Sequence, residues 1–101
     1  MSHESTTLGT RIAAGRKRLS LSQKLAERLR REDGSSISPQ YLNDIERDRR
    51  VPPEYLLQRI AAELGEDPDF LSILAGRIPD GLYSKLTTES GYQAFRKALP
   101  D

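Results

Sequence analysis

Apolar residues recur along this chain with the spacing of one helical face. A first helix is predicted over residues 7–19, because small or apolar side chains lie there at i, i+4, i+7 and i+11: Leu8, Ile12, Gly15 and Leu19. No alternating strand pattern competes with the helical period anywhere in the sequence. The pattern therefore predicts an all-α chain.

Two short helices are predicted next. Ser20 or Ser22 can cap a second helix that ends at Gly34 and turns three apolar side chains inward: Leu25, Ala26 and Leu29. A third helix is predicted over residues 38–47, because Ser38 is a favoured N-cap and the proline that follows it suits the first helical position. This third helix carries few apolar residues and many hydrogen-bonding ones.

Proline and glycine mark the ends of the later helices. Pro52-Pro53 opens a fourth helix that ends at Gly65, and Asp67-Pro68 opens a fifth that ends at Gly76. Residues 79–81 predict a turn, followed by one short turn of helix. A last helix, which Ser90 can cap, places apolar side chains at i, i+3 and i+7: Tyr92, Phe95 and Leu99.

The inventory of reactive side chains excludes much chemistry. The 101 residues include no Cys, and the single His lies at position 3. Thiol nucleophiles, Cys-type zinc sites and a Ser-His-Asp relay are thereby excluded, and the carboxylates at helix ends are explained by capping and solvation. We assign no catalytic residue, no metal ligand and no cofactor, and we expect no enzyme.

Charge and hydropathy add two expectations. Residues 1–50 hold eleven Lys and Arg against seven Asp and Glu, a net +4, whereas residues 51–101 hold five against eight, a net −3. A basic first half is typical of a chain that binds a polyanion, although a surplus of this size also arises by chance. No segment approaches the roughly 18 apolar residues of a membrane span, so we expect a cytoplasmic protein with no membrane partner.

A series of motifs resembles the helix-turn-helix domain of the Cro and phage-repressor family, also called the xenobiotic-response-element family. The resemblance covers Leu8 to Leu74. The first two helices match through Gly9-Thr10-Arg11-Ile12 with Arg16, and through Leu21-Ser22-Gln23 with Leu25-Ala26. The recognition helix matches from Ser38 to Arg47, and the last two helices match through Pro52-Pro53, Leu56-Leu57, Ile60-Ala61, Leu64-Gly65 and Phe70-Leu71. Each fragment alone is weak, but the ordered series is specific.

The resemblance implies a fold and a function. The fold would be a lambda-repressor-like five-helix bundle with a helix-turn-helix, plus a short C-terminal helical extension. A flexible leader would occupy residues 1–6, the DNA-binding domain residues 7–76 and the extension residues 77–101. The chain would be a sequence-specific transcriptional regulator of repressor type that inserts helix 38–47 into the major groove and is nucleoid-associated when bound.

Three departures from the family pattern matter. The spacing from Gln23 to Leu25-Ala26 is one residue short, and residues 30–36 replace the single glycine of the usual turn. This insertion either reaches phosphates through Arg30 and Arg31 or extends the second helix into solvent. Asp48 occupies a position where the family has a left-handed glycine, and Asp is among the few residues that tolerate that conformation.

The resemblance also assigns roles to residues. The predicted base-reading residues are Ser38, Pro39, Gln40, Asn43 and Asp44. The predicted phosphate-binding residues are Gln23, Lys24, Arg28, Arg30, Arg31, Tyr41, Arg47, Arg49 and Arg50. Arg16 and Glu46 are implied to form a structural ion pair between the first and third helices.

The C-terminal apolar stripe has two interpretations: it packs back on its own bundle, or it forms a dimer interface through Tyr83, Leu86, Tyr92, Phe95 and Leu99. A homodimer would read the two half-sites of a palindromic operator in double-stranded DNA. The alternative function is an antitoxin-like subunit that binds a protein partner encoded nearby and regulates its own synthesis by binding DNA.

Overall fold

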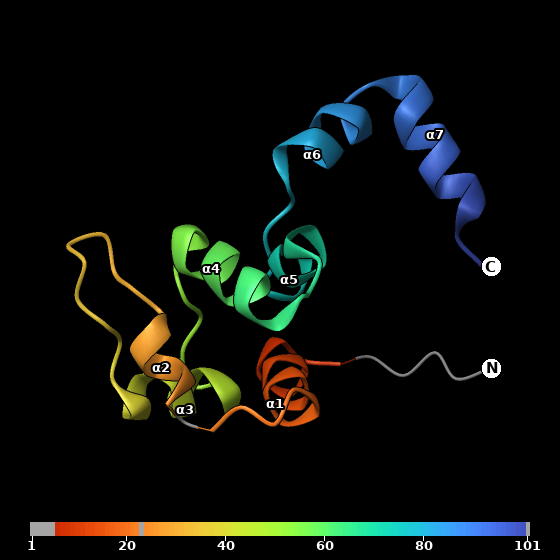
Figure 1. Cartoon of the computed structure of the whole chain (residues 1–101). Coiled ribbons are helices and arrows are strands. Elements are labelled where there is room, and N and C mark those ends of the chain that lie inside the picture. Colours follow the sequence, from red (N-terminus) through yellow and green to blue (C-terminus); the bar gives the residue numbers. More distant parts are fainter. Residues whose placement is uncertain (1–5, 23, 101) are drawn as a thin grey trace.

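The computed structural model of the chain describes residues 6–22 and 24–100. Within these ranges the backbone forms seven helices and no strand (Figure 1). The helices are α1 (Leu8–Arg18), α2 (Leu25–Arg28), α3 (Pro39–Glu46), α4 (Glu54–Leu64), α5 (Pro68–Leu74), α6 (Asp80–Leu86) and α7 (Glu89–Ala98). The all-α prediction is confirmed. The lambda-repressor-like arrangement of the first five helices stays a prediction.

Several predicted helix ends are found where the capping residues lie. The Ser38 hydroxyl accepts a hydrogen bond from the Tyr41 backbone N–H, and the Asp67 carboxylate accepts one from the Asp69 N–H. Each cap satisfies an N–H that has no partner inside its helix. Gly65 ends α4 in the left-handed conformation, with φ of 66°.

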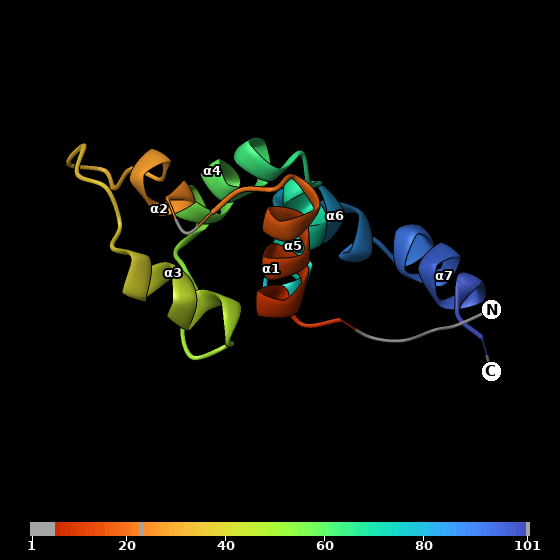
Figure 2. The same cartoon turned by 60° about the horizontal axis from the view of Figure 1, so that its bottom comes forward.

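The first five helices enclose one hydrophobic core. α1 packs on α3 and α4, α5 packs on α4, and α2 packs on α3 (Figure 2). The core takes residues from each of these helices and from the loop before α3: Leu8, Ile12, Leu25, Ala26, Leu29, Ile37, Leu42, Ile45, Leu56, Leu57, Ile60, Ala61, Leu64 and Leu71. Burial of one stripe on each short helix therefore holds the bundle together.

The prediction that the second helix continues to Gly34 is wrong. α2 ends at Arg28, and residues 29–37 form a hairpin in which the Ile37 N–H donates to the Leu29 carbonyl over 2.9 Å. The side chains of Leu29 and Ile37 are both buried. The hairpin returns the chain to the core, whereas a helix continued to Gly34 would carry it away from the core. At the tip, the Asp33 carboxylate accepts from the Ser35 N–H and hydroxyl, a local bond that competes with helix formation.

Two predictions at the C-terminal end are also wrong. Residues 79–81 do not form an isolated turn, because α6 begins at Asp80 directly after the extended backbone of Pro79. Thr88 caps α7 by accepting from the Gly91 N–H, so the helix starts two residues earlier than a cap at Ser90 predicts. An acidic residue follows each of these N-caps, where the helix dipole favours negative charge.

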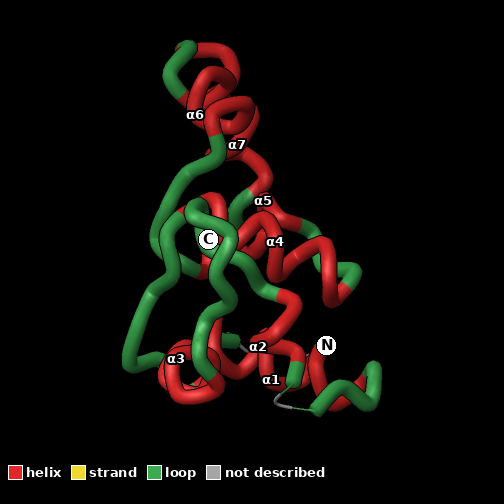
Figure 3. The backbone as a smooth tube through the Cα atoms, turned by 60° about the vertical axis from the view of Figure 1, so that its left-hand side comes forward, coloured by secondary structure: helices red, strands yellow, loops and turns green. Residues whose placement is uncertain are grey.

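Residues 77–100, called here the C-terminal arm, extend away from the bundle. Figures 1 and 3 show α6 and α7 beyond the end of α5, and the two arm helices pack on each other. Among the described residues of α6 and α7, none is buried. The arm is thus an amphipathic helix pair without a core of its own.

Candidate nucleic-acid interface

An ion pair ties the end of α3 to α1. The Arg16 Nε and Nη2 atoms donate to the two Glu46 carboxylate oxygens over 2.7 and 2.9 Å, and the Arg16 Nη1 donates to the Leu21 carbonyl. The side chains are only 13% and 7% exposed, and the hydrogen bond to Glu46 raises the pKa of the Arg16 guanidinium. The structure thus contains the pair that the family resemblance implied, in its bidentate form.

Asp48 ties the loop after α3 to the start of α1. Its backbone is left-handed, with φ of 61°, and its carboxylate accepts from the Thr7 hydroxyl over 2.6 Å and the Gly9 N–H over 2.8 Å. A carboxylate at a helix N-terminus satisfies an orphan N–H and is favoured by the helix dipole. The sequence indicated the left-handed backbone but not this cap, because its partners lie about forty residues away.

α1 and the end of α3 also approach backbone to backbone at Gly9. A Cβ atom at this position would lie 2.5 Å from the carbonyl oxygens of both Ile45 and Glu46. Glycine is therefore required for this close approach. Together with the ion pair and the Asp48 cap, it fixes how α3 is presented to solvent.

The predicted base-reading residues occupy the solvent side of α3. Ser38 is committed to the N-cap, and Pro39 and Gln40 are exposed. The Gln40 amide nitrogen donates to the Asp44 carboxylate over 3.0 Å, and Asn43 is half-buried on the following turn. The structure thus brings Gln40 and Asp44 into direct contact.

Tyr41 lies between two arginines that come from either side of α3. The Arg31 guanidinium, on the 29–37 hairpin, lies 4.9 Å from the ring centroid, and the Arg50 guanidinium lies 5.5 Å from it. Such cation–π contacts orient the guanidinium groups while their outer N–H groups stay free to donate. Two predicted phosphate-binding arginines therefore converge on the aromatic ring of a third predicted phosphate-binding residue, Tyr41.

The other predicted phosphate-binding residues are more scattered. Lys24 and Arg47 are exposed near the ends of α2 and α3, and the Arg49 guanidinium lies 3.8 Å from the Asp44 carboxylate. Arg28 faces α4, where its guanidinium lies 3.7 Å from the Glu63 carboxylate. Gln23 lies outside the described residues.

The 29–37 hairpin is anchored on α4 by a residue that the sequence did not single out. Arg59 donates from Nη1 to the carbonyl oxygens of Arg30 and Arg31, and its guanidinium also stacks on Tyr55 of its own helix. A groove of about 430 Å³ lies between the hairpin and α4, with four arginines among its lining residues. The insertion is thus a positioned element, and the long second helix considered from the sequence is not formed.

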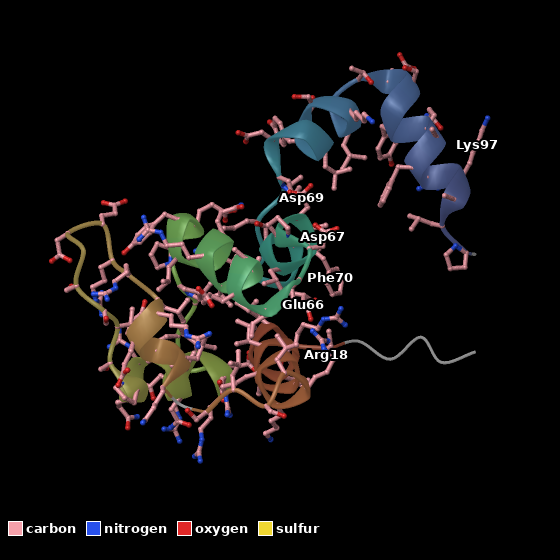
Figure 4. All side chains as sticks on the ribbon, viewed as in Figure 1. Arg18, Glu66, Asp67, Asp69, Phe70 and Lys97 are labelled. Atoms are coloured by element: carbon pink, nitrogen blue, oxygen red, sulfur yellow. The ribbon has the colours of Figure 1, made fainter. Side chains whose placement is uncertain are left out.

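Part of the charge that is split between the two halves of the chain is paired within the fold. The Glu66 carboxylate, almost fully buried, accepts from the guanidinium groups of Arg11 and Arg18 at 3.0 and 3.4 Å. Figure 4 places Arg18, Glu66 and Phe70 together where α1 meets α5, while Lys97 on the arm lies well away from them. Glu66 and, on α4, Glu63 are the two carboxylates of the second half that pair with arginines of the first half in the described residues.

At the base of the arm, Glu54 gathers three donors. The Ser72 hydroxyl and the Gln58 amide donate to one carboxylate oxygen over 2.7 and 3.0 Å, and the Arg77 guanidinium lies 3.4 Å from the other. These bonds, led by that from Ser72, hold the pKa of Glu54 below its ordinary value. The first residue of the arm is thereby fixed to α4.

The apolar side chains of the arm face solvent. Most of the large exposed apolar residues of the described chain lie from α5 onward: Phe70, Ile73, Ile78, Leu82, Tyr83, Tyr92, Phe95 and Leu99. Leu86, the last residue of α6, is half-buried. The intramolecular alternative, in which this stripe packs back on the bundle, is not the arrangement found.

In the described part of the chain, no helix is both long and apolar enough to cross a membrane.

Neither the curated proteins nor the solved structures gave a match to the chain. A family model described as "Helix-turn-helix", of the Cro and C1 type, matches residues 12–71, which is more than half of the sequence. The match spans α3 and all of the contacts that α3 makes with Arg16, Arg31 and Arg50. The chain therefore belongs to the helix-turn-helix family of Cro and phage-repressor proteins, a family of DNA-binding regulators.

Proposed function

We propose that the chain is a sequence-specific repressor that inserts α3 into the major groove of double-stranded DNA. The observation that carries this proposal is the exposed polar face of α3, where Gln40 is flanked by arginines on the hairpin and on the loop after the helix. A major-groove helix needs a slim face of hydrogen-bonding side chains, and guanidinium groups on either side of it suit the phosphates of the groove walls. The ion pair with Arg16 and the Asp48 cap support this role by holding α3 rigidly.

The first test is a titration of the full chain with the DNA upstream of its own gene. Fluorescence anisotropy at moderate salt should give saturable binding with a dissociation constant below about 1 μM, tighter than typical non-specific attachment. Binding that is no tighter than to a random duplex would exclude sequence-specific recognition of that DNA. A reporter gene placed behind the bound site then gives the sign of regulation.

Gln40→Ala should lower affinity for the specific site by roughly 1–3 kcal/mol and leave affinity for random duplex nearly unchanged. Arg50→Ala should weaken both alike, because a phosphate contact carries little sequence information. Gln58→Ala is a matched control, because the Gln58 amide donates to the carboxylate of Glu54, one turn away on α4, as the Gln40 amide donates to Asp44 on α3. Equal losses for Gln40→Ala and Arg50→Ala on both duplexes would mean that the base-reading face is elsewhere.

We further propose that the C-terminal arm joins two copies of the chain into a homodimer on a palindromic operator. The arm carries an apolar stripe without a covering partner, and its four Lys and Arg against two Asp and Glu give a net charge of only +2, so repulsion between two copies is weak. Two recognition helices roughly 34–36 Å apart would read two half-sites and multiply specificity. An unlike protein encoded by a neighbouring gene is the competing partner for the same stripe.

Replacing Tyr92 and Phe95 together by Ser should convert the dimer to a monomer of 11.4 kDa, as measured by sedimentation equilibrium. The far-ultraviolet spectrum and the unfolding midpoint of the bundle should change little, because neither side chain is buried against it. Gln93→Ser on the same helix is the control and should leave the mass unchanged. A wild-type chain that is monomeric at tens of micromolar, and that co-purifies with the product of an adjacent gene, would favour the competing partner.

A further inference from the structure

Asp44 is the acidic residue at the centre of the polar face of α3. Its Oδ1 atom accepts from the Gln40 amide and lies 3.8 Å from the Arg49 guanidinium, and its Oδ2 atom lies 4.0 Å from the Arg50 Nε atom. The side chain is 21% exposed, whereas both arginines are about 60% exposed. One carboxylate is therefore surrounded by three of the side chains that are candidates for contacting DNA.

The contacts to the two arginines are long and solvent-exposed. Ion pairs of this kind are worth little, and salt screens them further. An approaching phosphate can therefore take the guanidinium groups from Asp44, but it must then lie near an uncompensated carboxylate. Because non-specific attachment to DNA is almost entirely electrostatic, a negative charge at this point weakens it directly.

The contact to Gln40 has a different consequence. A Gln amide has two N–H donors and one carbonyl acceptor, and only one N–H is given to Asp44. When the N–H that points away from the carbonyl is the one given to Asp44, the other N–H and the carbonyl oxygen remain, and these are the pair that binds N7 and N6 of adenine in the major groove. Asp44 thus holds the amide in one orientation and leaves its adenine-reading edge available.

We propose that Asp44 determines specificity by an indirect route: it orients Gln40 toward an adenine and keeps attachment to other DNA weak. It is then a positioning residue, in contrast to the direct base-reading role that the sequence predicted for it. The inference rests on the proposed function, because it requires α3 to face DNA.

The test compares Asp44→Asn and Asp44→Gln with the wild-type chain on a random-sequence duplex and on the specific site, by anisotropy at several salt concentrations. Both variants remove the charge and keep an amide oxygen that can accept from Gln40, but only Asn keeps the length of the Asp side chain. On random duplex we expect about three- to ten-fold tighter binding and a salt slope steeper by up to about one unit. Affinity for the specific site should rise less than this, so the ratio of specific to random affinity should fall.

Asp33→Asn is the matched control, because Asp33 is an exposed carboxylate at the hairpin tip and makes its hydrogen bonds to Ser35. It removes the same charge and should change random-duplex affinity by less than two-fold. Asp44→Glu, which keeps the charge, should stay near the wild type on random duplex.

Two outcomes would overturn the inference. If Asp44→Asn and Asp33→Asn tighten random binding equally, the effect is net charge alone. If Asp44→Asn instead weakens specific binding and leaves random binding unchanged, Asp44 reads a base directly. These results differ from failure of the proposed function, in which the wild-type chain itself would bind no duplex measurably. Circular dichroism of each variant verifies that the helices are intact.

Discussion

Glu46→Ala is expected to lower the free energy of unfolding by about 3 kcal/mol, the low end for removing one partner of a buried ion pair. The Arg16 side chain is 13% exposed, and its guanidinium would lose both carboxylate bonds, although the Leu21 carbonyl would still accept from it. A buried charge without its partner is the costly outcome, more than the loss of attraction itself. Urea unfolding followed by circular dichroism gives the value, and the melting temperature should fall by more than about 10 °C.

A second carboxylate provides the control. Glu63→Ala removes the partner of Arg28, whose side chain is largely exposed, and should cost less than about 1 kcal/mol. In a double-mutant cycle, Arg16→Met combined with Glu46→Leu should be more stable than Glu46→Ala alone, since no buried charge is left unpaired. A Glu46→Ala variant as stable as Glu63→Ala would mean that Arg16 finds water or another partner, and that α3 is not held through this pair.

Gly9→Ala is expected to cost about 3 kcal/mol, although alanine is the better helix former. The new Cβ would lie 2.5 Å from two backbone carbonyl oxygens of α3, so α1 and α3 must separate. Separation would also stretch the bond from the Gly9 N–H to Asp48. We expect weaker specific DNA binding even where the variant is folded, because α3 would be presented at a changed angle.

Gly15→Ala on the same helix is a close control. Its Cβ would lie 3.4 Å from a Leu64 side-chain carbon, a contact that a flexible side chain accommodates. Its effect should be small, between no change and a gain of about 1 kcal/mol from helix propensity. The midpoints of thermal unfolding of Gly9→Ala and Gly15→Ala are compared. Equal midpoints would show that α1 and α3 lie farther apart than in the structure.

The site was predictable in the parts that depend on local chemistry. The Ser38-Pro39 pair gives the start of α3, because an N-cap and the residue after it act within one turn. The order of motifs along the chain gave the family, and the helical period gave most core residues of α1 to α5, although Leu19 and Phe70 of the predicted apolar faces are exposed. Arg59 carried no such signal, because an arginine on an outer helix face is usually solvated and only the folded hairpin supplies its carbonyl partners.

The sequence by itself determined that this chain is all-α, which helix faces are buried, and that α3 carries polar groups suited to base edges. Only the tertiary structure decided that residues 29–37 form a hairpin, that Asp48 caps α1, and that Asp44 holds Gln40 beside two arginines. The physical reason is the range of the interactions. Periodicity and capping act within a few residues, whereas burial of Leu29 and Ile37, and the pairing of charges that are distant in sequence, depend on which segments the core brings together.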